Sequence, residues 1–341
     1  MPKTVLLTGA SGFIAKHVAV KLLDAGYHVR GSVRSLERGA EVAAAVGPQL
    51  AEAGGLDARL GFTPLDLAQD KGWAEAMQGV DALVHTASPF PMTQPRDPEE
   101  LIRPAVDGAL RALRAARDAG VGRVVMTSSS VAIAEAELPP GKTVHDEDDW
   151  TDPARPGLTP YTISKTLAER AAWDFVRDEA PGLRLTTINP SFVLGAPLDR
   201  HYGTSLKVIE RLLAGRDPML PRFAMACVDV RDVAEAHVRA LRMPAAEGRR
   251  IIASEATLWF RDIAGELKAA FPDRRIARRE APDLLMRLVG LFDPAVRAIV
   301  PALGRHFTVS NDRARELLGL ECRSARAAVR EAGAWLVANG A

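Results

Sequence analysis

The sequence predicts an α/β protein in which a doubly wound parallel sheet is followed by a smaller, mostly helical lobe. Three observations predict this class. Short β-branched or apolar runs alternate with longer Ala/Leu/Arg-rich stretches as far as about residue 190, a glycine-rich turn follows the first run, and the alternation is lost after Asn189. Strands that alternate with helices of this length form βαβ units, in which the helices cover both faces of a parallel sheet.

The elements follow from hydrophobic periodicity, taken in chain order. Strands are predicted at Val5–Thr8, Tyr27–Val33, Ala58–Leu67, Ala82–His85, Arg123–Thr127 and Leu183–Ile188, and later at Phe223–Val228 and Arg249–Ala253. Helices are predicted at Phe13–Ala25, Leu36–Ala53, Trp73–Gln78, Pro98–Ala119 and Tyr161–Glu179, and later near Ser205–Ala214, Val233–Leu241, Asp283–Leu291 and Ala325–Val337. We expect a dinucleotide-binding domain over residues 1–190, to which residues 225–254 return. Residues 191–224 and 255–341 then form a substrate-binding lobe.

Composition excludes several classes of function. The 341 residues carry 44 Lys and Arg against 43 Asp and Glu, a formal charge of +1, so no basic surface for nucleic acid is expected. No apolar run approaches the roughly 20 residues that cross a bilayer. The two cysteines, Cys227 and Cys322, provide neither a disulfide framework nor a thiolate metal site. We expect a soluble, cytoplasmic enzyme without a metal, acting as a monomer or a homodimer.

The turn after the first strand has the spacing of a dinucleotide-binding loop. Gly9 permits the tight turn, Gly12 lets backbone N–H groups approach a pyrophosphate, and Ala15 keeps the helix close to the sheet. The helix N-terminus that follows offers unpaired donors and a positive dipole end. The residues predicted to contact the cofactor here are Thr8, Gly9, Ser11, Gly12, Phe13 and Ile14. This sheet is therefore predicted to be of the Rossmann type.

The end of the second strand favours NADP(H) over NAD. NAD-binding proteins usually place an acid about 20 residues beyond the loop, but here Arg34 follows the strand and the first carboxylate is Glu37. The guanidinium of Arg34 can pair with a 2′-phosphate, and Arg38 is a second candidate.

Two further strand ends contribute candidates for the cofactor site. Asp66 can accept a hydrogen bond from an adenine amino group or simply cap its own turn, and Leu67 can pack on the ring. Thr86, Ala87 and Ser88 end the fourth strand at the carboxyl edge of the sheet, where open α/β sheets bind ligands.

The pentapeptide Tyr161–Lys165 carries the predicted chemistry. On a helix, residues four apart share a face, so the phenol and the amine point the same way. A phenol has a pKa of about 10, and a neighbouring ammonium stabilises its phenolate, which makes it a usable acid and base. Thr127 ends the fifth strand and begins a serine cluster, and we expect Thr127 to contact the cofactor and Ser129 to donate to a substrate carbonyl oxygen.

The sequence as a whole resembles the extended short-chain dehydrogenase/reductases. Within them it resembles the dihydroflavonol 4-reductase-like and aldehyde (carbonyl) reductase-like group of the NAD-dependent epimerase/dehydratase superfamily. The motifs that carry the resemblance are TGASGFIA, DALVHTASPF, DPEELIRPAVDGAL, YTISK, INPSFVLG and VDVRDVAEAH.

The resemblance implies roles for individual residues. Tyr161 matches the general acid/base, Lys165 the residue that bonds the nicotinamide ribose and lowers the pKa of the tyrosine, and Ser129 the catalytic serine. Arg34 matches the basic residue of NADP-preferring members. The residues matched to the stretch around the nicotinamide are Asn189, Pro190, Phe192 and Val193.

Two departures from the family's plant members argue against their substrates. Where plant flavonoid reductases carry an Asn, this chain has Ala134, and the stretch ending in YTISK differs from the NWYCYGK-type motif of plant cinnamoyl-CoA reductases.

The substrate is expected to be a small carbonyl or alcohol with an apolar or aromatic body. The candidate contacts are Phe90, Met92, Ser129, Phe192 and Phe223, with Met219 as a further wall and the helix Leu284–Leu291 as a lid. The predicted function is reversible NADPH-dependent reduction of aldehydes or ketones. Two alternatives stay open, namely a nucleotide-sugar epimerase or dehydratase with retained NAD(P), and a non-catalytic NADP-binding sensor.

Overall fold

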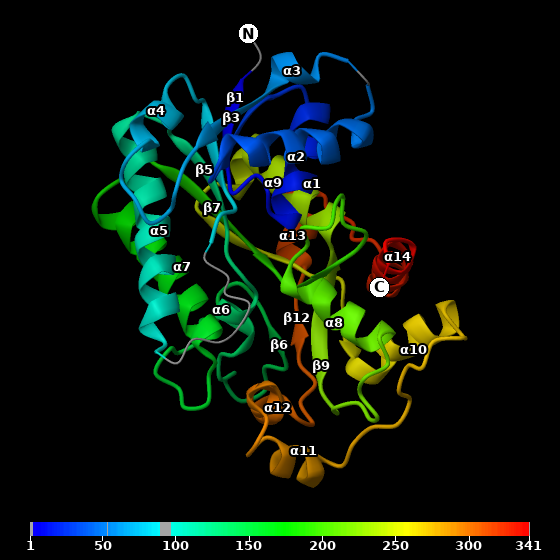
Figure 1. The fold of residues 1–341 in the computed structure, drawn as a ribbon. Coiled ribbons are helices and arrows are strands. Elements are labelled where there is room, and N and C mark those ends of the chain that lie inside the picture. The colour runs from blue at the N-terminus through cyan, green and yellow to red at the C-terminus, as the bar shows by residue number, and fades with distance from the viewer. Residues whose placement is uncertain (1–2, 53, 89–96, 341) are drawn as a thin grey trace.

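The central element is a seven-stranded, entirely parallel sheet (Figure 1). It is seen in a computed structural model that describes residues 3–52, 54–88 and 97–340. The strand order is β10-β7-β5-β4-β1-β2-β3. The bounds are β1 Thr4–Thr8, β2 His28–Val33, β3 Leu60–Pro64, β4 Ala82–His85, β5 Arg123–Thr127, β7 Arg184–Pro190 and β10 Arg249–Ala253. The predicted Rossmann-type fold class is therefore confirmed.

Helices cover both faces of this sheet, as the alternation of its side chains requires. Along β1, Val5 and Leu7 enter one core and Leu6 enters the other, because successive residues of a strand point to opposite faces. The first core is closed by α1 (Phe13–Asp24), α2 (Leu36–Val46) and α9 (Val230–Arg242), and the second by α4 (Trp73–Met77), α5 (Glu99–Asp118) and α7 (Pro160–Asp178). Helices α5 and α7 run side by side over the second face (Figure 1).

Two predicted elements are shorter than expected. The helix predicted over Leu36–Ala53 ends at Val46, where Gly47 and Pro48 turn the chain into a single 3-10 turn. The strand predicted over Ala58–Leu67 begins only at Leu60, because Leu56–Arg59 form one helical turn, α3. Asp66 and Leu67 consequently lie beyond the end of β3.

The remaining chain builds a second region around a three-stranded sheet of order β11-β9-β8. Strand β8 (Phe192–Leu194) follows β7 directly, β9 is Ala224–Asp229 and β11 is Ala256–Trp259. Helices α8 (Thr204–Leu213), α10 (Phe260–Ala270) and α14 (Ala325–Ala338) pack around it, and the first core runs on into this region without a break. The chain thus enters the second region at β8, returns to the large sheet at β10 and leaves it again.

Short elements connect the two regions. Strand β6 (Val144–His145) pairs in parallel with β12 (Thr308–Val309), and α6 (Val131–Ala134) lies between β5 and β6. Helices α11 (Asp283–Val289), α12 (Pro294–Ile299) and α13 (Asp312–Leu318) complete the C-terminal part.

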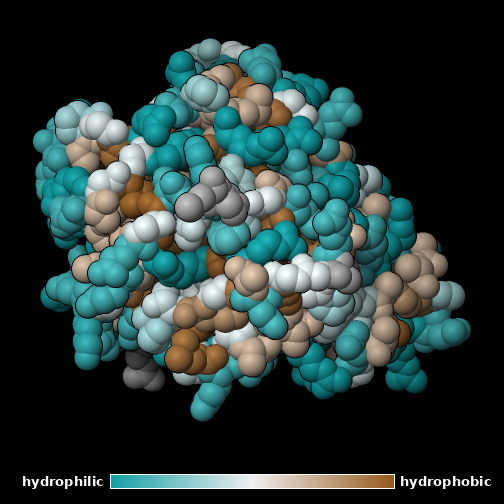
Figure 2. All heavy atoms as spheres, turned by 90° about the horizontal axis from the view of Figure 1, so that it is seen from above, coloured by the Kyte–Doolittle hydropathy of each residue, from teal (hydrophilic) through white to brown (hydrophobic). Residues whose placement is uncertain are grey.

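The surface is mixed in polarity. On the face shown in Figure 2, hydrophobic residues are scattered among hydrophilic ones. The main exposed apolar side chains of the described chain lie on and just after α11, where Leu284 is 70% and Phe292 is 87% exposed. Within the described residues, no helix combines the length and the apolar character needed to span a bilayer.

Candidate active site

The glycine turn between β1 and α1 is shaped by close backbone contacts. Gly9 has φ +66°, and a Cβ placed there would lie 2.9 Å from Cβ of Ala87, just beyond β4. Gly12 has an ordinary φ of −74°, but its Cβ would lie 3.2 Å from the carbonyl oxygen of Gly9. The first glycine is therefore required for both conformation and space, and the second for space alone.

The N-terminus of α1 fits the pyrophosphate of a dinucleotide. No side chain caps this end of the helix, so the first N–H groups of α1, at Phe13 and Ile14, are left for another acceptor. Gly12 is exposed and Ser11 and Ile14 are half-buried, which leaves the turn accessible. An open helix N-terminus beside a glycine turn is the usual arrangement for binding phosphate oxygens.

Two arginine side chains lie just beyond the carboxyl end of β2. Arg34 directly follows β2, is exposed, and makes no ion pair with another residue in the described part of the chain. Arg38 donates to Glu41 at 2.7 Å and to Nε2 of His201 at 2.8 Å. The loop that carries His201 is tied to α1, because the buried Lys16 forms an ion pair with Asp199.

The residues after β3 and β4 occupy the same edge of the sheet. Asp66 is exposed, and its carboxylate accepts a 2.9 Å hydrogen bond from the N–H of Ala68, so it caps its own turn. Leu67 packs on Gly108 of α5. Thr86 donates to the Thr8 carbonyl at 2.6 Å. Ser88, two residues further along the chain, is half-buried.

The predicted Ser–Tyr–Lys set comes together at this carboxyl edge. Thr159 caps α7 by accepting a 3.1 Å hydrogen bond from the N–H of Thr162, and Pro160 occupies the first helical position. Tyr161 therefore lies in the first turn and Lys165 in the second, with Nζ of Lys165 5.9 Å from the centre of the Tyr161 ring. Tyr161 is hydrogen-bonded to Ser129, which is 7% exposed.

Burial determines the protonation of both groups in the absence of a ligand. It raises the pKa of Tyr161, and the hydrogen bond with Ser129 opposes the rise. It lowers the pKa of Lys165 to about 8, and the negative charge of Glu169 opposes the fall. Near neutral pH the phenol therefore holds its proton and the amine is largely charged.

The stretch after β7 lies beside the serine turn. The N–H of Ser130 donates to the Pro190 carbonyl at 2.9 Å, and the amide of the buried Asn189 donates to the Ser129 carbonyl at 3.2 Å. Phe192 is half-buried, while the Val193 side chain lies in the core. Thr127 is engaged by the buried His237 through a 2.7 Å hydrogen bond.

Only some of the predicted substrate contacts fall on described residues. Phe90 and Met92 lie outside the described residues. Phe223 is half-buried and stacks on Phe260 with ring centres 5.0 Å apart, so it packs within the second region. Leu284, Leu285 and Leu288 of α11 are exposed.

A buried ion pair near the site was missed in the sequence. Glu169, wholly buried on α7, pairs with Arg250 of β10 through a 2.8 Å contact. The helical spacing could have indicated Glu169. It lies four residues after Lys165 and eight after Tyr161, and therefore on the same face of the helix. Lys16 and His201 were missed too, because nothing local indicates that the loop after β8 reaches α1.

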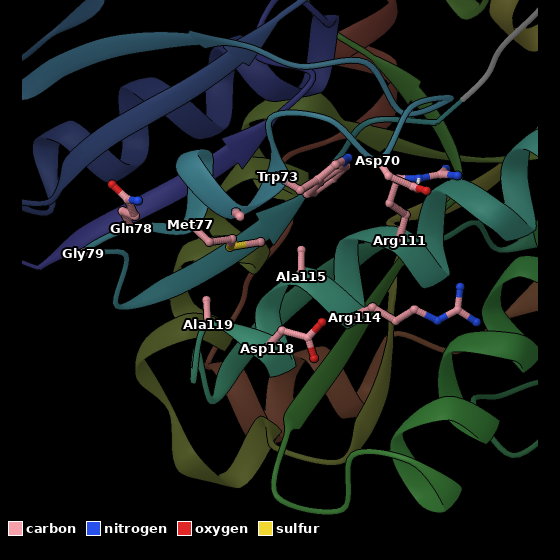
Figure 3. Close-up of a pocket in the computed structure, with 11 residues that line it drawn as sticks. Asp70, Trp73, Met77, Gln78, Gly79, Arg111, Arg114, Ala115, Asp118 and Ala119 are labelled. Atoms are coloured by element: carbon pink, nitrogen blue, oxygen red, sulfur yellow. Dashed lines mark hydrogen bonds and ion pairs between the residues drawn. The ribbon is translucent and has the colours of Figure 1, made fainter.

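Among the described residues, one cavity lies near this edge of the sheet and another lies away from it. One of about 420 Å³ adjoins the start of α7 and is lined by Leu158, Thr159, Glu135, Arg155 and Arg305, among others. The other, about 610 Å³, lies between α4 and α5 and is lined by Trp73 and Ala115, among others; there Asp70 points toward Arg111 (Figure 3). The larger cavity contains none of the predicted site residues.

Comparison with known proteins identifies the family. The model of the NAD dependent epimerase/dehydratase family matches residues 5–253. A ketoreductase of Aspergillus niger, azaE, is 33% identical over 97% of both chains, and cinnamoyl-CoA reductase 1 of Arabidopsis thaliana is 36% identical over 74% of this chain and 71% of its own. Among solved structures, the NADPH complex of Gre2 from Candida albicans is 29% identical, covers 100% of both chains and has a TM-score of 0.79. The yeast methylglyoxal/isovaleraldehyde reductase Gre2 with NADPH is 28% identical over 98% of both, also with a TM-score of 0.79.

The chain therefore belongs to the NAD-dependent epimerase/dehydratase family. Within that family it belongs to the extended short-chain dehydrogenase/reductases of the reductase-like group, and it is an oxidoreductase.

The two roles of Gly9 can be separated by mutation. Gly9→Ala and Gly26→Ala both place a Cβ at positive φ (+66° and +83°), which costs about 1–3 kcal/mol each. Only Gly9→Ala also pushes a Cβ into Ala87, since nothing lies within 4 Å at Gly26. We expect Gly9→Ala to lower the free energy of unfolding in urea more than Gly26→Ala, and equal losses would contradict the close contact.

Proposed function

We propose that this protein is an NADPH-dependent reductase that converts aldehydes or ketones to alcohols, reversibly. The observation that carries the proposal is the meeting of Ser129, Tyr161 and Lys165 at the carboxyl edge of the sheet, opposite an open helix N-terminus. Two solved relatives hold NADPH, and one of them is called a methylglyoxal/isovaleraldehyde reductase.

Each side chain has a distinct part in the proposed mechanism. When bound, the nicotinamide supplies the hydride. The Ser129 hydroxyl donates to the carbonyl oxygen and keeps it within reach of Tyr161. Tyr161, protonated because burial raises its pKa, gives its proton to that oxygen as the alkoxide develops. The Lys165 ammonium then stabilises the phenolate that remains.

The cofactor would extend from α7 to the end of β2. Residues of the glycine turn and of α1 would bind the pyrophosphate, Asn189 and Pro190 would lie against the nicotinamide, and Arg34 would pair with the 2′-phosphate. Residues 1–190 with 225–254 would form this cofactor-binding domain, and residues 191–224 and 255–341 the substrate lobe. The carbonyl compound would enter between them, near the cavity at the start of α7.

Tyr161→Phe tests the central assignment. Removing the hydroxyl removes the proton donor, so we expect reduction of a panel of aromatic and aliphatic carbonyls to slow by about a hundredfold or more. NADPH oxidation followed at 340 nm measures this, and Tyr27→Phe, a half-buried tyrosine outside the site, is the matched control. Equal rates for Tyr161→Phe and the unmodified protein would end the assignment. Cofactor retained through purification, with no net consumption of NADPH, would favour an epimerase instead.

Arg34→Ala tests the choice of cofactor. Losing a charge-assisted contact to the 2′-phosphate should raise KM for NADPH about tenfold or more and leave KM for NADH nearly unchanged. Arg242→Ala, exposed at the far end of α9, is the control. If KM for NADPH and KM for NADH change by the same factor, Arg34 does not contact the 2′-phosphate.

The pH profile follows from the low pKa of Lys165. Below about pH 8 the amine is charged, and above it the amine loses the proton that allows it to stabilise the phenolate. We therefore expect kcat/KM for NADPH, which reports groups of the free enzyme, to be level at neutral pH and to fall as the pH rises through about 8. A level profile as far as pH ~10, the ordinary range for lysine, would contradict this pKa.

A further inference from the structure

Glu169 is a fully buried carboxylate surrounded by donors from three strands. Its Oε2 accepts hydrogen bonds from Ser128 at 2.6 Å and from Asn189 at 2.7 Å. Its Oε1 accepts from Thr187 at 2.9 Å and from Arg250 at 2.8 Å. These partners follow or belong to β5, β7 and β10, while Glu169 itself belongs to α7. One side chain thus joins the helix that carries Tyr161 to the sheet edge that carries Ser129.

The two bonds of Oε2 lead directly to the serine turn. Ser128 is the neighbour of Ser129 in the chain, and the Asn189 amide that donates to Glu169 also donates to the Ser129 carbonyl at 3.2 Å. The backbone N–H of Ser128 completes the connection by donating to the Ile188 carbonyl at 2.7 Å. Hydrogen bonds therefore link Glu169 both to the neighbour of Ser129 and, through Asn189, to the Ser129 backbone.

Arg250 keeps the carboxylate charged in this buried position. Burial raises the pKa of Glu169, but the charge of Arg250 and the hydrogen bonds from Arg250, Ser128 and Thr187 outweigh it, so the pKa lies below its usual value. Arg250 is itself well held, since it donates to the carbonyls of Glu147 at 2.9 Å and Asp149 at 2.6 Å, and its guanidinium lies 3.5 Å from the centre of the Trp150 ring.

The same carboxylate faces Lys165 one turn earlier on α7. The other titratable groups near that amine are Tyr161 on the same helix and His85 of β4, whose pKa burial lowers to about 3. His85 is therefore neutral, and it shares a 2.9 Å hydrogen bond with Thr8. The buried residues of α5 and α6 that border α7 are all apolar or glycine. Glu169 is thus the negative charge that favours the ammonium form of Lys165.

We propose that Glu169 is a positioning residue that holds Ser129 in place against Tyr161 and maintains Lys165 as an ammonium. Because Glu169 is wholly buried, it acts through Ser128, Asn189 and the electric field at Lys165. The inference rests on the proposed reductase function for its kinetic readout, but its electrostatic half concerns the cofactor-free protein alone.

Glu169→Gln is the first test. It removes the charge at nearly constant shape, so the Lys165 amine should lose its proton at a pH about one unit lower than in the unmodified protein. The readout is the titration of ¹³Cε-labelled lysine by NMR without cofactor; the chain has eight lysines, and Lys165→Met identifies the signal. We also expect kcat to fall about tenfold or more because Ser129 is misplaced, and the alkaline limb of kcat/KM to move with the titration. An unchanged Lys165 titration would overturn the proposal.

Two further variants protect the test against simple loss of stability. Glu169→Gln leaves Arg250 buried without its partner, whereas Glu169→Gln/Arg250→Met removes both charges and should recover thermal stability. If the charge of Glu169 sets the pKa of Lys165, that pKa should be as low in the double variant as in Glu169→Gln. Glu169→Asp keeps the charge but shortens its reach, so it should preserve the titration and lower kcat. If the double variant regains the original titration, Glu169 is merely structural.

A control and a reference separate this inference from the proposed function. Asp232→Asn removes another buried carboxylate with an arginine partner, Arg323, away from the site, and it should lower stability without moving the Lys165 titration. If the unmodified protein reduces no carbonyl, the proposed function fails while the NMR result still stands. If it does reduce carbonyls and Glu169→Gln does so with an unshifted profile, only this inference fails.

Discussion

A carboxylate removed from water is tolerated only when donors and a counter-charge replace the water, and Glu169 meets this condition at the junction of helix α7 with the central sheet. The strands of the large sheet could pack against α7 through apolar contacts alone. The ion pair with Arg250 adds a constraint that apolar contacts do not supply, because hydrogen bonds have direction. It fixes how far α7 can slide or rotate over β5 and β7, and with it the distance between the serine turn and the phenol. The packing of α7 and the proposed chemistry would therefore depend on the same group.

At the carboxyl edge of the large sheet, burial shifts the pKa values of Tyr161 and Lys165 more than any single neighbouring group does. Burial raises the pKa of Tyr161 and lowers that of Lys165, so it favours the neutral form of each. The hydrogen bond between Ser129 and Tyr161 and the charge of Glu169 oppose these trends. A phenol that retains its proton beside an amine that is largely charged suits the delivery of a proton to a carbonyl oxygen, which is the direction of reduction.

Sequence reasoning succeeded where local chemistry determines structure. The glycine turn was predictable because β1, the turn and α1 are contiguous, and the pairing of Tyr161 with Lys165 follows from helical spacing alone. A parallel sheet follows from the alternation of strands and helices up to about residue 190, which covers six of its seven strands. The ends of elements were less predictable, as at Gly47–Pro48, where a turn interrupts a long Ala-rich stretch.

What the sequence could not reveal was contact between distant segments. Glu169 and Arg250 are 81 positions apart, and a charge within a strand such as β10 gives no sign of its partner. Likewise Lys16 and Asp199 are 183 positions apart. The stacking of Phe223 on Phe260 is another contact between separate segments that the sequence does not indicate.

The position of β10 has a consequence for how the chain is made. It pairs with β7 at the edge of the large sheet, yet it is synthesised some sixty residues later, after the chain has passed through β8, α8, β9 and α9. Until then the backbone groups along the outer side of β7 have no neighbouring strand, and Glu169 lacks its arginine. A nascent or truncated chain that stops before residue 249 would present an unpaired strand, a template for association with other chains, so completion of this protein doubles as protection from aggregation.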